Sequence, residues 1–374
     1  MKPFVPEKLP LEEVQWDMLI PLLGKANRAL ATYGGVLSAM PNSELLLSPL
    51  TTQEAVLSSR IEGTQATLGE VLKFEAGEAP AEESKRQDIQ EIRNYRNALR
   101  YAETALANGS NRPFNLNLLL QLHSILLDSV RGKNKGRGQF RDGQNWIGAP
   151  GCPIEEASFV PPEQSMLASL LDNWEKYYHE ERPDPLGQLA ILHAQFEVIH
   201  PFWDGNGRLG RILIPIFLYE KGLIIRPMFY LSSYMEEHKE EYIKRLRALG
   251  QEDDAWNKWI EFFLIAIEKQ SKLNINKAKQ ILDFYERMKS RFLELTHSQY
   301  AVPLLDGMFL RPIFKSTDLD FAADPRPSRQ AVAGLLRTLR EAGVLAVLRE
   351  GRGRRAQILA FKELINLCEG KDVL

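Results

Sequence analysis

Ile199-His-Pro-Phe-Trp-Asp-Gly-Asn-Gly-Arg-Leu-Gly-Arg211 is the stretch of this 374-residue chain that decides both fold and chemistry. Gly205, Asn206 and Gly207 suit a tight turn, because glycine adopts backbone conformations that other residues resist. Apolar residues follow with the spacing of one helix face: Leu209, Ile212, Leu213, Ile216 and Phe217. The pattern predicts a turn leading into a helix N-terminus, where free N–H groups and the helix dipole favour a bound anion.

Two arginines, Arg208 and Arg211, stand in the first turn of this predicted helix. A positive charge there opposes the helix dipole and costs about 0.3 to 1 kcal/mol. On a helical wheel both lie off the apolar stripe, so neither is expected to be a core residue. A bound polyanion such as a phosphate chain would explain why two cations gather at this helix start.

A carboxylate and an imidazole flank the turn. Asp204 is suited to Mg²⁺, which takes one or two protein carboxylates and fills its other positions with phosphate oxygens and water. His200 is suited to accept a proton near neutral pH. Taken singly, a histidine before proline is more often a cap, and zinc binding by His193, His200 and Asp204 fits no common spacing. The conjunction of base, carboxylate, turn and two arginines predicts a site for phosphate chemistry.

The bulk composition is that of an ordinary globular protein, with 44% hydrophobic and 26% charged residues and a net charge of -2. This balance gives no general attraction for nucleic acid or acidic membranes. Two cysteines, Cys152 and Cys368, are too few for a disulfide framework. The start lacks the apolar core of a signal peptide, and no apolar run reaches the roughly 18 residues of a spanning helix. We expect a cytoplasmic protein without a membrane segment.

Helical periodicity dominates the chain up to about residue 300. The predicted helices cover residues 51–62, 116–130, 163–179, 186–199, 208–221, 233–249 and 255–295. Residues 144–162 predict a hairpin-like element, with two short strands on either side of a Gly/Pro turn. Near the end, a helix over 325–342 and strand-like runs at 343–349 and 356–361 flank the basic turn 350–355, which predicts a small winged-helix-like module.

The stretch from His200 to Arg211 resembles the Fic family signature, H-P-F-x-[D/E]-G-N-G-R-x-x-R, at each fixed position. The resemblance covers about residues 115–270, through the segments 122–127, 138–141, 145–148 and 193–200. It implies a mainly α protein: the helical Fido fold with a small β-hairpin flap, an N-terminal helical segment and a C-terminal winged-helix-like domain. The implied limits are 1–114 for the N-terminal region, 115–270 for the catalytic domain, 271–299 for a helical connection and 300–374 for the last domain.

The resemblance also implies an activity and roles for single residues. The chain would be a protein adenylyltransferase that transfers AMP from ATP to a hydroxyl of a target protein or of itself. His200 would deprotonate the hydroxyl, Asp204 would hold Mg²⁺ on the α- and β-phosphates, and Arg211 would engage the γ-phosphate. The residues expected around ATP are Glu62, Ile147, Gly148, Asp204, Gly205, Asn206, Gly207, Arg208, Arg211 and Tyr242. Gly250 stands where some members use an asparagine near the adenine.

An upstream segment, Ser58-Ser-Arg-Ile-Glu62-Gly63, is similar to the family's inhibitory motif, [S/T]-x-x-x-E-[G/N]. Ser58 and Glu62 are four residues apart and share one face of a helix expected at about residues 51–63. Locally, Glu62 is typical of a solvated glutamate at a frayed helix end. The resemblance implies instead that Glu62 lies against Arg211 and competes with the γ-phosphate, so that the enzyme inhibits itself.

Two other functions stay open. Residues 326–355 contain eight arginines and two glutamates, so the C-terminal module is a candidate nucleic-acid surface of a DNA-binding regulator with a vestigial Fic domain. The intact His200, Asp204 and Arg211 argue against that function. The alternative within catalysis is removal of AMP from a modified protein, with Glu62 positioning water. The sequence leaves open the reaction direction, the nucleotide, the target and a homodimer.

Overall fold

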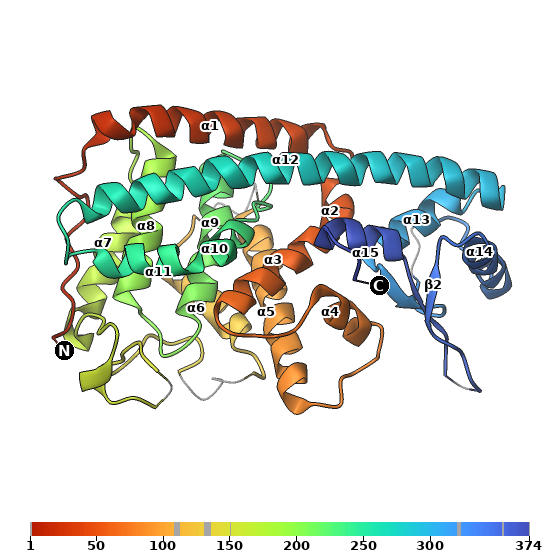
Figure 1. Cartoon of the computed structure of the whole chain (residues 1–374), viewed down its shortest axis with the longest axis horizontal. Helices are drawn as coiled ribbons and strands as arrows, with labels where there is room; N and C mark the ends of the chain where they lie inside the picture. The colour runs from red at the N-terminus through yellow and green to blue at the C-terminus, as the bar shows by residue number, and fades with distance from the viewer. Residues whose placement is uncertain are drawn as a thin grey trace. The chain divides into compact units, whose positions relative to one another are not determined.

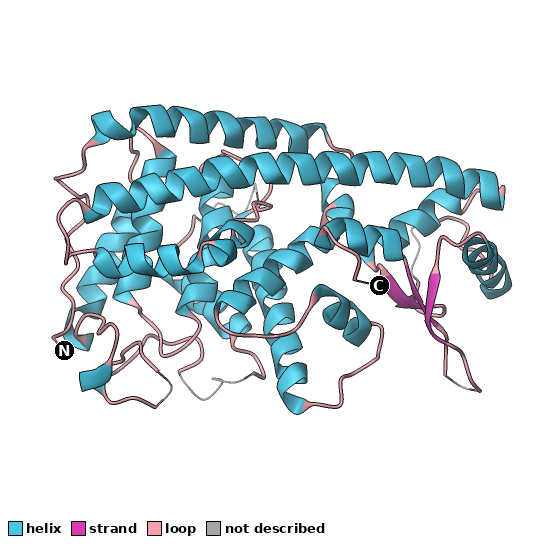
Figure 2. Ribbon diagram, in the orientation of Figure 1, coloured by secondary structure: helices cyan, strands magenta, loops and turns pink. Residues whose placement is uncertain are grey.

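The computed structural model describes residues 2–107, 113–130, 136–149, 151–319, 323–353 and 355–373, and helices dominate it (Figure 1, Figure 2). The expected mainly helical fold is confirmed. The α-helices are α1 (Trp16–Ala39), α2 (Ser43–Leu46), α3 (Ser48–Ile61), α4 (Leu68–Glu75), α5 (Glu83–Leu106), α6 (Leu116–Leu126), α7 (Leu167–His179), α8 (Pro185–Ile199), α9 (Asn206–Glu220), α10 (Ser232–Glu237), α11 (Lys239–Ala248), α12 (Ala255–Thr296), α13 (Ala301–Leu310), α14 (Arg329–Glu341) and α15 (Lys362–Glu369). Short 3-10 helices are η1 (Ile154–Glu156) and η2 (Gln164–Met166), and the strands are β1 (Ile313–Lys315), β2 (Ala346–Arg349) and β3 (Ile358–Ala360).

The chain divides into two compact units. The first comprises Met1–Gly35, Leu57–Gly63 and Asn94–Leu273, and the second comprises Val36–Val56, Thr64–Arg93 and Asn274–Leu374. The segment 58–63 therefore belongs to the same unit as the stretch 199–211. The domain limits expected from the sequence stay predictions.

In the first unit, α8 and α9 pack against each other and form the scaffold of the site. The N-terminus of α8 is capped by Asp184, whose Oδ1 accepts hydrogen bonds from the N–H groups of Leu186 (2.8 Å) and Gly187 (3.0 Å). Nearly every residue of α8 is buried, and two tryptophans bind its carbonyls: Trp174 donates to Leu192 (2.9 Å) and Trp259 to Ala190 (2.8 Å). Such a buried, hydrogen-bonded helix holds its C-terminal residue rigidly.

The hairpin expected at residues 144–162 is smaller than predicted. One antiparallel bridge joins Ile147 to Phe159, with N–H groups donating in both directions at 2.8 and 3.1 Å, in place of two strands. Pro161 and Pro162 follow the bridge and lack the N–H groups that would extend the ladder. The Gln144 amide donates to the Pro161 carbonyl instead (2.9 Å). Pro150, in the predicted turn, lies outside the described residues.

In the second unit, the predicted helix and both strand-like runs near the C-terminus are confirmed as α14, β2 and β3. The three strands form an antiparallel sheet in the order β1-β3-β2. Strand β1 was not predicted, because its two apolar residues, Ile313 and Phe314, stand between Pro312 and a polar run that begins at Lys315. The winged-helix assignment stays a prediction, and Arg354 of the basic turn lies outside the described residues.

Three further segments differ from expectation. The helix predicted over 116–130 ends at Leu126, the last residue of α6. The helix predicted over 233–249 is interrupted at His238, which separates α10 from α11. The helix expected from residue 208 begins earlier, at Asn206, because Gly205 takes the capping position with a φ of 81°. Among the described residues, no helix is both long and apolar enough to cross a membrane.

Candidate active site

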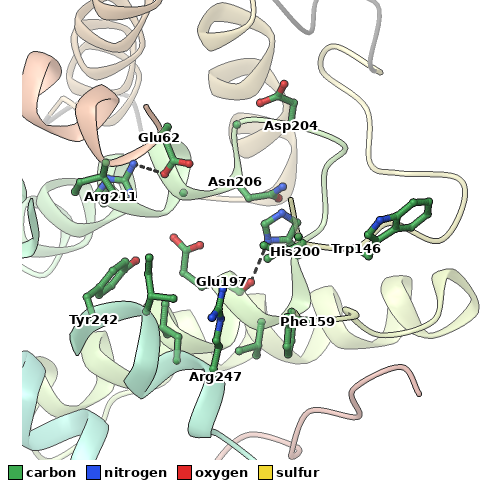
Figure 3. A pocket seen from close by; sticks show the side chains of 18 of the residues that line it. Glu62, Trp146, Phe159, Glu197, His200, Asp204, Asn206, Arg211, Tyr242 and Arg247 are labelled. Atoms are coloured by element: carbon green, nitrogen blue, oxygen red, sulfur yellow. Dashed lines mark hydrogen bonds and ion pairs between the residues drawn. The ribbon is translucent and has the colours of Figure 1, made fainter. Parts of the chain in front are cut away.

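The link between α8 and α9 forms one wall of a cavity of about 440 Å³ (Figure 3). His200 follows the last turn of α8 in a left-handed conformation (φ 50°, ψ 60°), and its N–H donates to the Phe196 carbonyl at 3.1 Å. Gly205 is also left-handed, which costs glycine little. These two positions reverse the chain direction, so that the His200 ring and the first turn of α9 border the same cavity.

The Asn206 side chain holds this link closed. Its Oδ1 accepts the Phe202 N–H and its Nδ2 donates to the Phe202 carbonyl, both at 2.9 Å. The side chain was expected to help cradle phosphate, whereas its two hydrogen bonds to Phe202 are to the backbone of its own loop. The backbone amides of the turn are therefore the groups fixed in place for an anion.

Three residues that the sequence analysis did not assign to the site stabilise the segment between α8 and α9. The His123 ring stacks on Phe202 (3.8 Å between centroids), and its Nε2 lies 3.0 Å from the Asp204 carbonyl. Arg141 donates from Nε to the His200 carbonyl at 3.1 Å, and Asn145 donates to the Phe202 carbonyl at 2.9 Å. Their segments carry the Fic resemblance, which was the available signal. Hydrogen bonds to backbone carbonyls leave no mark in a hydrophobic pattern.

The protonation state of His200 is the one that a general base requires. Its Nδ1 lies 3.3 Å from the Glu197 carbonyl, which can only accept, so the hydrogen is on Nδ1 and the lone pair on Nε2. Burial lowers the pKa of His200 to about 4. The imidazole is therefore neutral at pH 7 and able to take up a proton.

The end of α3 lies against Arg211. The guanidinium donates from Nε to Oγ of Ser58 (2.8 Å) and from Nη2 to the Ser58 carbonyl (2.9 Å) and to Oε1 of Glu62 (2.6 Å). The predicted contact between Glu62 and Arg211 is therefore present. Gly63 follows with a φ of 100°, as expected for a residue after a helix end.

The Glu62 carboxylate occupies the predicted anion position. A Cβ on Gly207, in the first turn of α9, would lie 2.2 Å from Oε1 of Glu62, so only glycine admits the carboxylate there. Desolvation would raise the pKa of Glu62, but the charge and hydrogen bond of Arg211 outweigh it, and the pKa is lowered. Glu62 is thus ionised at neutral pH, in the place where a phosphate would be expected.

The expectation that Arg208 and Arg211 lie outside the core is wrong. Both side chains are almost fully buried, at 5% and 2% exposed. Arg211 is covered by the end of α3, and Arg208 turns back to Asp204, with Nη2 3.3 Å from Oδ1. A helical wheel considers one helix alone and cannot show the segments that cover its polar face.

Tyr242 is fixed by a residue that had been weighed as a zinc ligand. His193 Nδ1 lies 3.2 Å from the Gly210 carbonyl, and its Nε2 lies 3.0 Å from the Tyr242 hydroxyl. Both nitrogens of this buried ring are engaged, so His193 is not free to bind a metal with His200 and Asp204. In the described part of the chain, no group of three or more acidic, His or Cys side chains is placed to hold a metal ion.

The cavity brings together most of the expected residues. Its lining includes Glu62, Ile147, Gly148, His200, Asp204, Gly205, Asn206, Gly207, Arg211 and Tyr242. Arg208, Ser58 and Gly63 do not line it; Ser58 supports Arg211 from behind. Lining residues that sequence reasoning missed are Ile61, Trp146, Phe159, Glu197, Val198, Trp203, Ile243, Leu246 and Arg247. Gly250 lies elsewhere, against the Phe4 ring.

Comparisons with known families agree with this geometry. The model of the Fic/DOC family N-terminal region matches residues 20–104, and that of the Fic/DOC family matches residues 113–218. A helical scaffold that presents a histidine and a helix N-terminus to one cavity is thus that of a Fic-type protein. The chain belongs to the Fic/DOC family.

Curated relatives match part of the chain. A probable protein adenylyltransferase of Aquifex aeolicus is 29% identical over 166 residues, which are 42% of this chain and 46% of the relative. The protein adenylyltransferase Fic of Drosophila ananassae is 27% identical over 182 residues, 46% of this chain and 33% of the relative. The match therefore spans less than half of each relative's length.

Solved structures share the fold. A Fic family protein from Desulfovibrio desulfuricans G20 has a TM-score of 0.58 at 17% identity, covering 96% of this chain and 98% of that one. Fic-1 from C. elegans has a TM-score of 0.54 at 18% identity, covering 72% and 75%. The expected Fido fold is confirmed.

Proposed function

We propose that this protein is a protein adenylyltransferase that transfers AMP from ATP to a hydroxyl side chain of a target protein or of itself. The observation that carries the proposal is the convergence of neutral His200, the Asp204 carboxylate and the first turn of α9 on one cavity. The names of the curated relatives from Aquifex aeolicus and Drosophila ananassae support it.

The transfer is a displacement at the α-phosphorus. Nε2 of His200 takes the proton of the target hydroxyl, whose oxygen forms a bond to the α-phosphorus. The bond between the α-phosphorus and the oxygen bridging to the β-phosphate breaks, and pyrophosphate leaves with that electron pair. The amides of Gly205 to Gly207 and the Arg211 guanidinium stabilise the charge on the phosphate oxygens.

The residues present fit Mg²⁺. Asp204 contributes a partly exposed carboxylate (29%) at the cavity wall, and Mg²⁺ is commonly held by one or two carboxylates with phosphate oxygens and water. When bound, Mg²⁺ would neutralise charge on the α- and β-phosphates. The part of this chain is to supply Asp204, whose position is set by Arg208 on the side chain and His123 on the backbone.

Autoinhibition by Glu62 is part of this proposal. With Glu62 on Arg211, the γ-phosphate lacks its cationic partner, so ATP is held in a geometry unsuited to in-line attack. The reverse reaction, removal of AMP with Glu62 positioning water, is the alternative at the same site. Both directions use His200, and they differ in whether loss of Glu62 increases or abolishes turnover.

The proposal also includes a partner other than ATP and the target protein. The C-terminal part has exposed arginines that suit a nucleic-acid phosphate backbone: Arg329, Arg337, Arg340, Arg352 and Arg355. Nucleic-acid binding is the second candidate function. A homodimer and a cytoplasmic location, the latter inferred from the two free cysteines, complete the proposal.

The test is incorporation of label from ATP. Wild type and Glu62→Gly are incubated with Mg²⁺ and α-labelled ATP, CTP, GTP or UTP, and label is measured on the protein and in lysate. We expect label from ATP, more with Glu62→Gly, and none with Glu62→Gly/His200→Ala. Absence of label from every nucleotide with Glu62→Gly would refute transfer.

A further inference from the structure

Glu197 is a carboxyl group in the cavity to which the proposed mechanism gives no role. It lies on α8, one turn before His200, and lines the cavity. Its side chain is 10% exposed; its Oε1 is buried, lies 4.0 Å from Nε2 of His193 and makes no hydrogen bond among the described residues. The carboxyl group as a whole borders the cavity and is therefore placed to meet a bound ligand.

The residues that line the cavity with Glu197 are of two kinds. One kind is polar and lies where phosphates are expected: Glu62, Arg211 and the turn 205–207. The other kind is apolar and suits a flat base: Ile147, Phe159, Ile243 and Leu246. In Figure 3 the Glu197 carboxyl is seen below Glu62 and Arg211 and above Phe159.

We propose that Glu197 recognises the ribose of the nucleotide, its carboxyl group accepting a hydrogen bond from a ribose hydroxyl. The inference rests on the proposed nucleotide function and deepens it. His200 must lie near the α-phosphorus, and the unit joined to the α-phosphate on the side away from the β-phosphate is the ribose. A carboxyl group one helical turn from His200 is therefore placed for the sugar.

The chemistry favours a hydroxyl over a phosphate as the ligand of Glu197. A carboxylate repels phosphate oxygens, whereas a hydroxyl donates to a carboxyl group in either protonation state. Burial raises the pKa of Glu197 to about 7, against the opposing charge of Arg211. The group is thus an acceptor with less than a full negative charge, which limits repulsion of the nearby phosphates.

Gly210 leaves the space in which Glu197 lies. A Cβ on Gly210 would come within 2.3 Å of Oε1 of Glu197. The clash involves the end of a flexible side chain, so Gly210→Ala would displace the carboxyl group at little cost to the fold. This variant moves Glu197 while leaving its chemistry intact.

The test compares nucleotides that differ in one hydroxyl. The parent is the full-length Glu62→Gly protein, and dissociation constants for ATP, 2′-deoxy-ATP and 3′-deoxy-ATP with Mg²⁺ are measured by calorimetry. The parent should prefer ATP over at least one deoxy nucleotide by roughly tenfold or more, the range of a hydrogen bond to a charged group. Adding Glu197→Leu, of similar volume, should bring that ratio to about one, and Glu197→Gln should keep part of it.

Controls separate the sugar from other effects. Adding Glu240→Gln, an exposed α11 carboxylate outside this cavity, should leave the ratio unchanged, and Gly210→Ala should reduce it. A ratio that survives Glu197→Leu, or equal weakening of all three nucleotides, would overturn the inference while labelling from ATP still supported transfer. Absence of ATP binding to the parent would overturn both proposals.

Discussion

Oε1 of Glu62 lies 2.6 Å from Nη2 of Arg211, although 149 positions separate the two residues in sequence. The same carboxylate fills the space beside Gly207, at the positive end of α9. The Glu62 carboxylate therefore contacts both groups that the sequence predicts for binding a phosphate, which are Arg211 and the N-terminus of α9. The carboxylate of Glu62, the residue after α3, thus lies where the proposed function expects the terminal phosphate of a nucleotide.

Glu62→Gly is expected to raise the rate of AMP incorporation. Removal of the carboxylate frees Arg211, and because a misplacement of about an ångström can cost on the order of 10²-fold, the gain should reach about 10- to 100-fold. Arg211→Ala in that background should lower the rate again, since the gain depends on the freed guanidinium. Glu62→Asp, one methylene shorter, should be partly activating.

The measurement is the rate of label transfer in these four proteins at the same ATP and Mg²⁺ concentrations. Arg60→Ala is a suitable control, because Arg60 lies on the same helix end and pairs with Glu236 (3.9 Å) rather than with Arg211. It should stay near wild type. Equal rates for wild type and Glu62→Gly would mean that the Glu62–Arg211 pair is structural only.

His200 determines the expected dependence on pH. Since burial lowers its pKa to about 4, the ring is neutral, and active as a base, from pH 7 down to about pH 5. As the pH falls through about 4 the ring gains a proton, and kcat/KM should fall with it. In Glu62→Gly the fall should come at slightly lower pH, because the Glu62 charge raises the pKa of His200.

A pH–rate profile of Glu62→Gly tests this, with His200→Ala to show that the base is the group observed. That variant should still bind ATP, since the imidazole acts on the hydroxyl and not on the nucleotide. A half-maximal rate near pH 6.5 would indicate an exposed, unperturbed histidine instead.

Sequence reasoning found the parts of the site that lie close together in the chain. The turn 205–207, His200 and the helix that follows are local features, and a resemblance supplied the distant Glu62. What it missed depends on neighbours far apart in sequence. The burial of Arg211 comes from α3, and the unpaired Oε1 of Glu197 becomes evident only when its surroundings are known. A helical pattern shows which residues are apolar. It does not show which polar residues from distant segments contact each other.

Asp204→Ala should weaken Mg²⁺-dependent nucleotide binding and activity together, because the carboxylate is the group placed for the metal. It also leaves Arg208 without the Asp204 contact, so Asp204→Asn, which retains a hydrogen-bond acceptor, is the matched variant. Magnesium titrations of ATP affinity in the Glu62→Gly background are the measurement. A titration curve that does not change would place the metal at another residue.

The exposed arginines of the C-terminal part should give salt-sensitive binding of duplex DNA if that surface is used. Arg352→Ala/Arg355→Ala should lower the affinity and reduce its dependence on salt. With fewer phosphate contacts, binding releases fewer counterions from the DNA. Gel shifts at low and moderate salt measure both. No shift with the intact protein at low salt would rule out this candidate function.

His123 should act on Asp204 through the backbone. Its Nε2 lies 3.0 Å from the Asp204 carbonyl, which can only accept, so Nε2 carries the hydrogen, and Nδ1 accepts the Gly138 N–H at 3.0 Å. Burial lowers the pKa of His123 to about 4, so the ring stays neutral and keeps both bonds at neutral pH. His123→Ala would remove both bonds and the stacking on Phe202, and should cost about 2 to 4 kcal/mol of stability.

Without the hydrogen bond from His123, the Asp204 carboxylate is held less firmly in position. The Mg²⁺ concentration for half-maximal activity should therefore rise several-fold in His123→Ala, while the pH profile set by His200 should not change. His123→Gln retains an N–H donor of similar reach and should restore part of the Mg²⁺ affinity. Both are measured in the Glu62→Gly background, after thermal melts have shown that the variants are folded. If a folded His123→Ala protein titrates with Mg²⁺ as its parent does, the ring supports the fold alone and does not position the carboxylate.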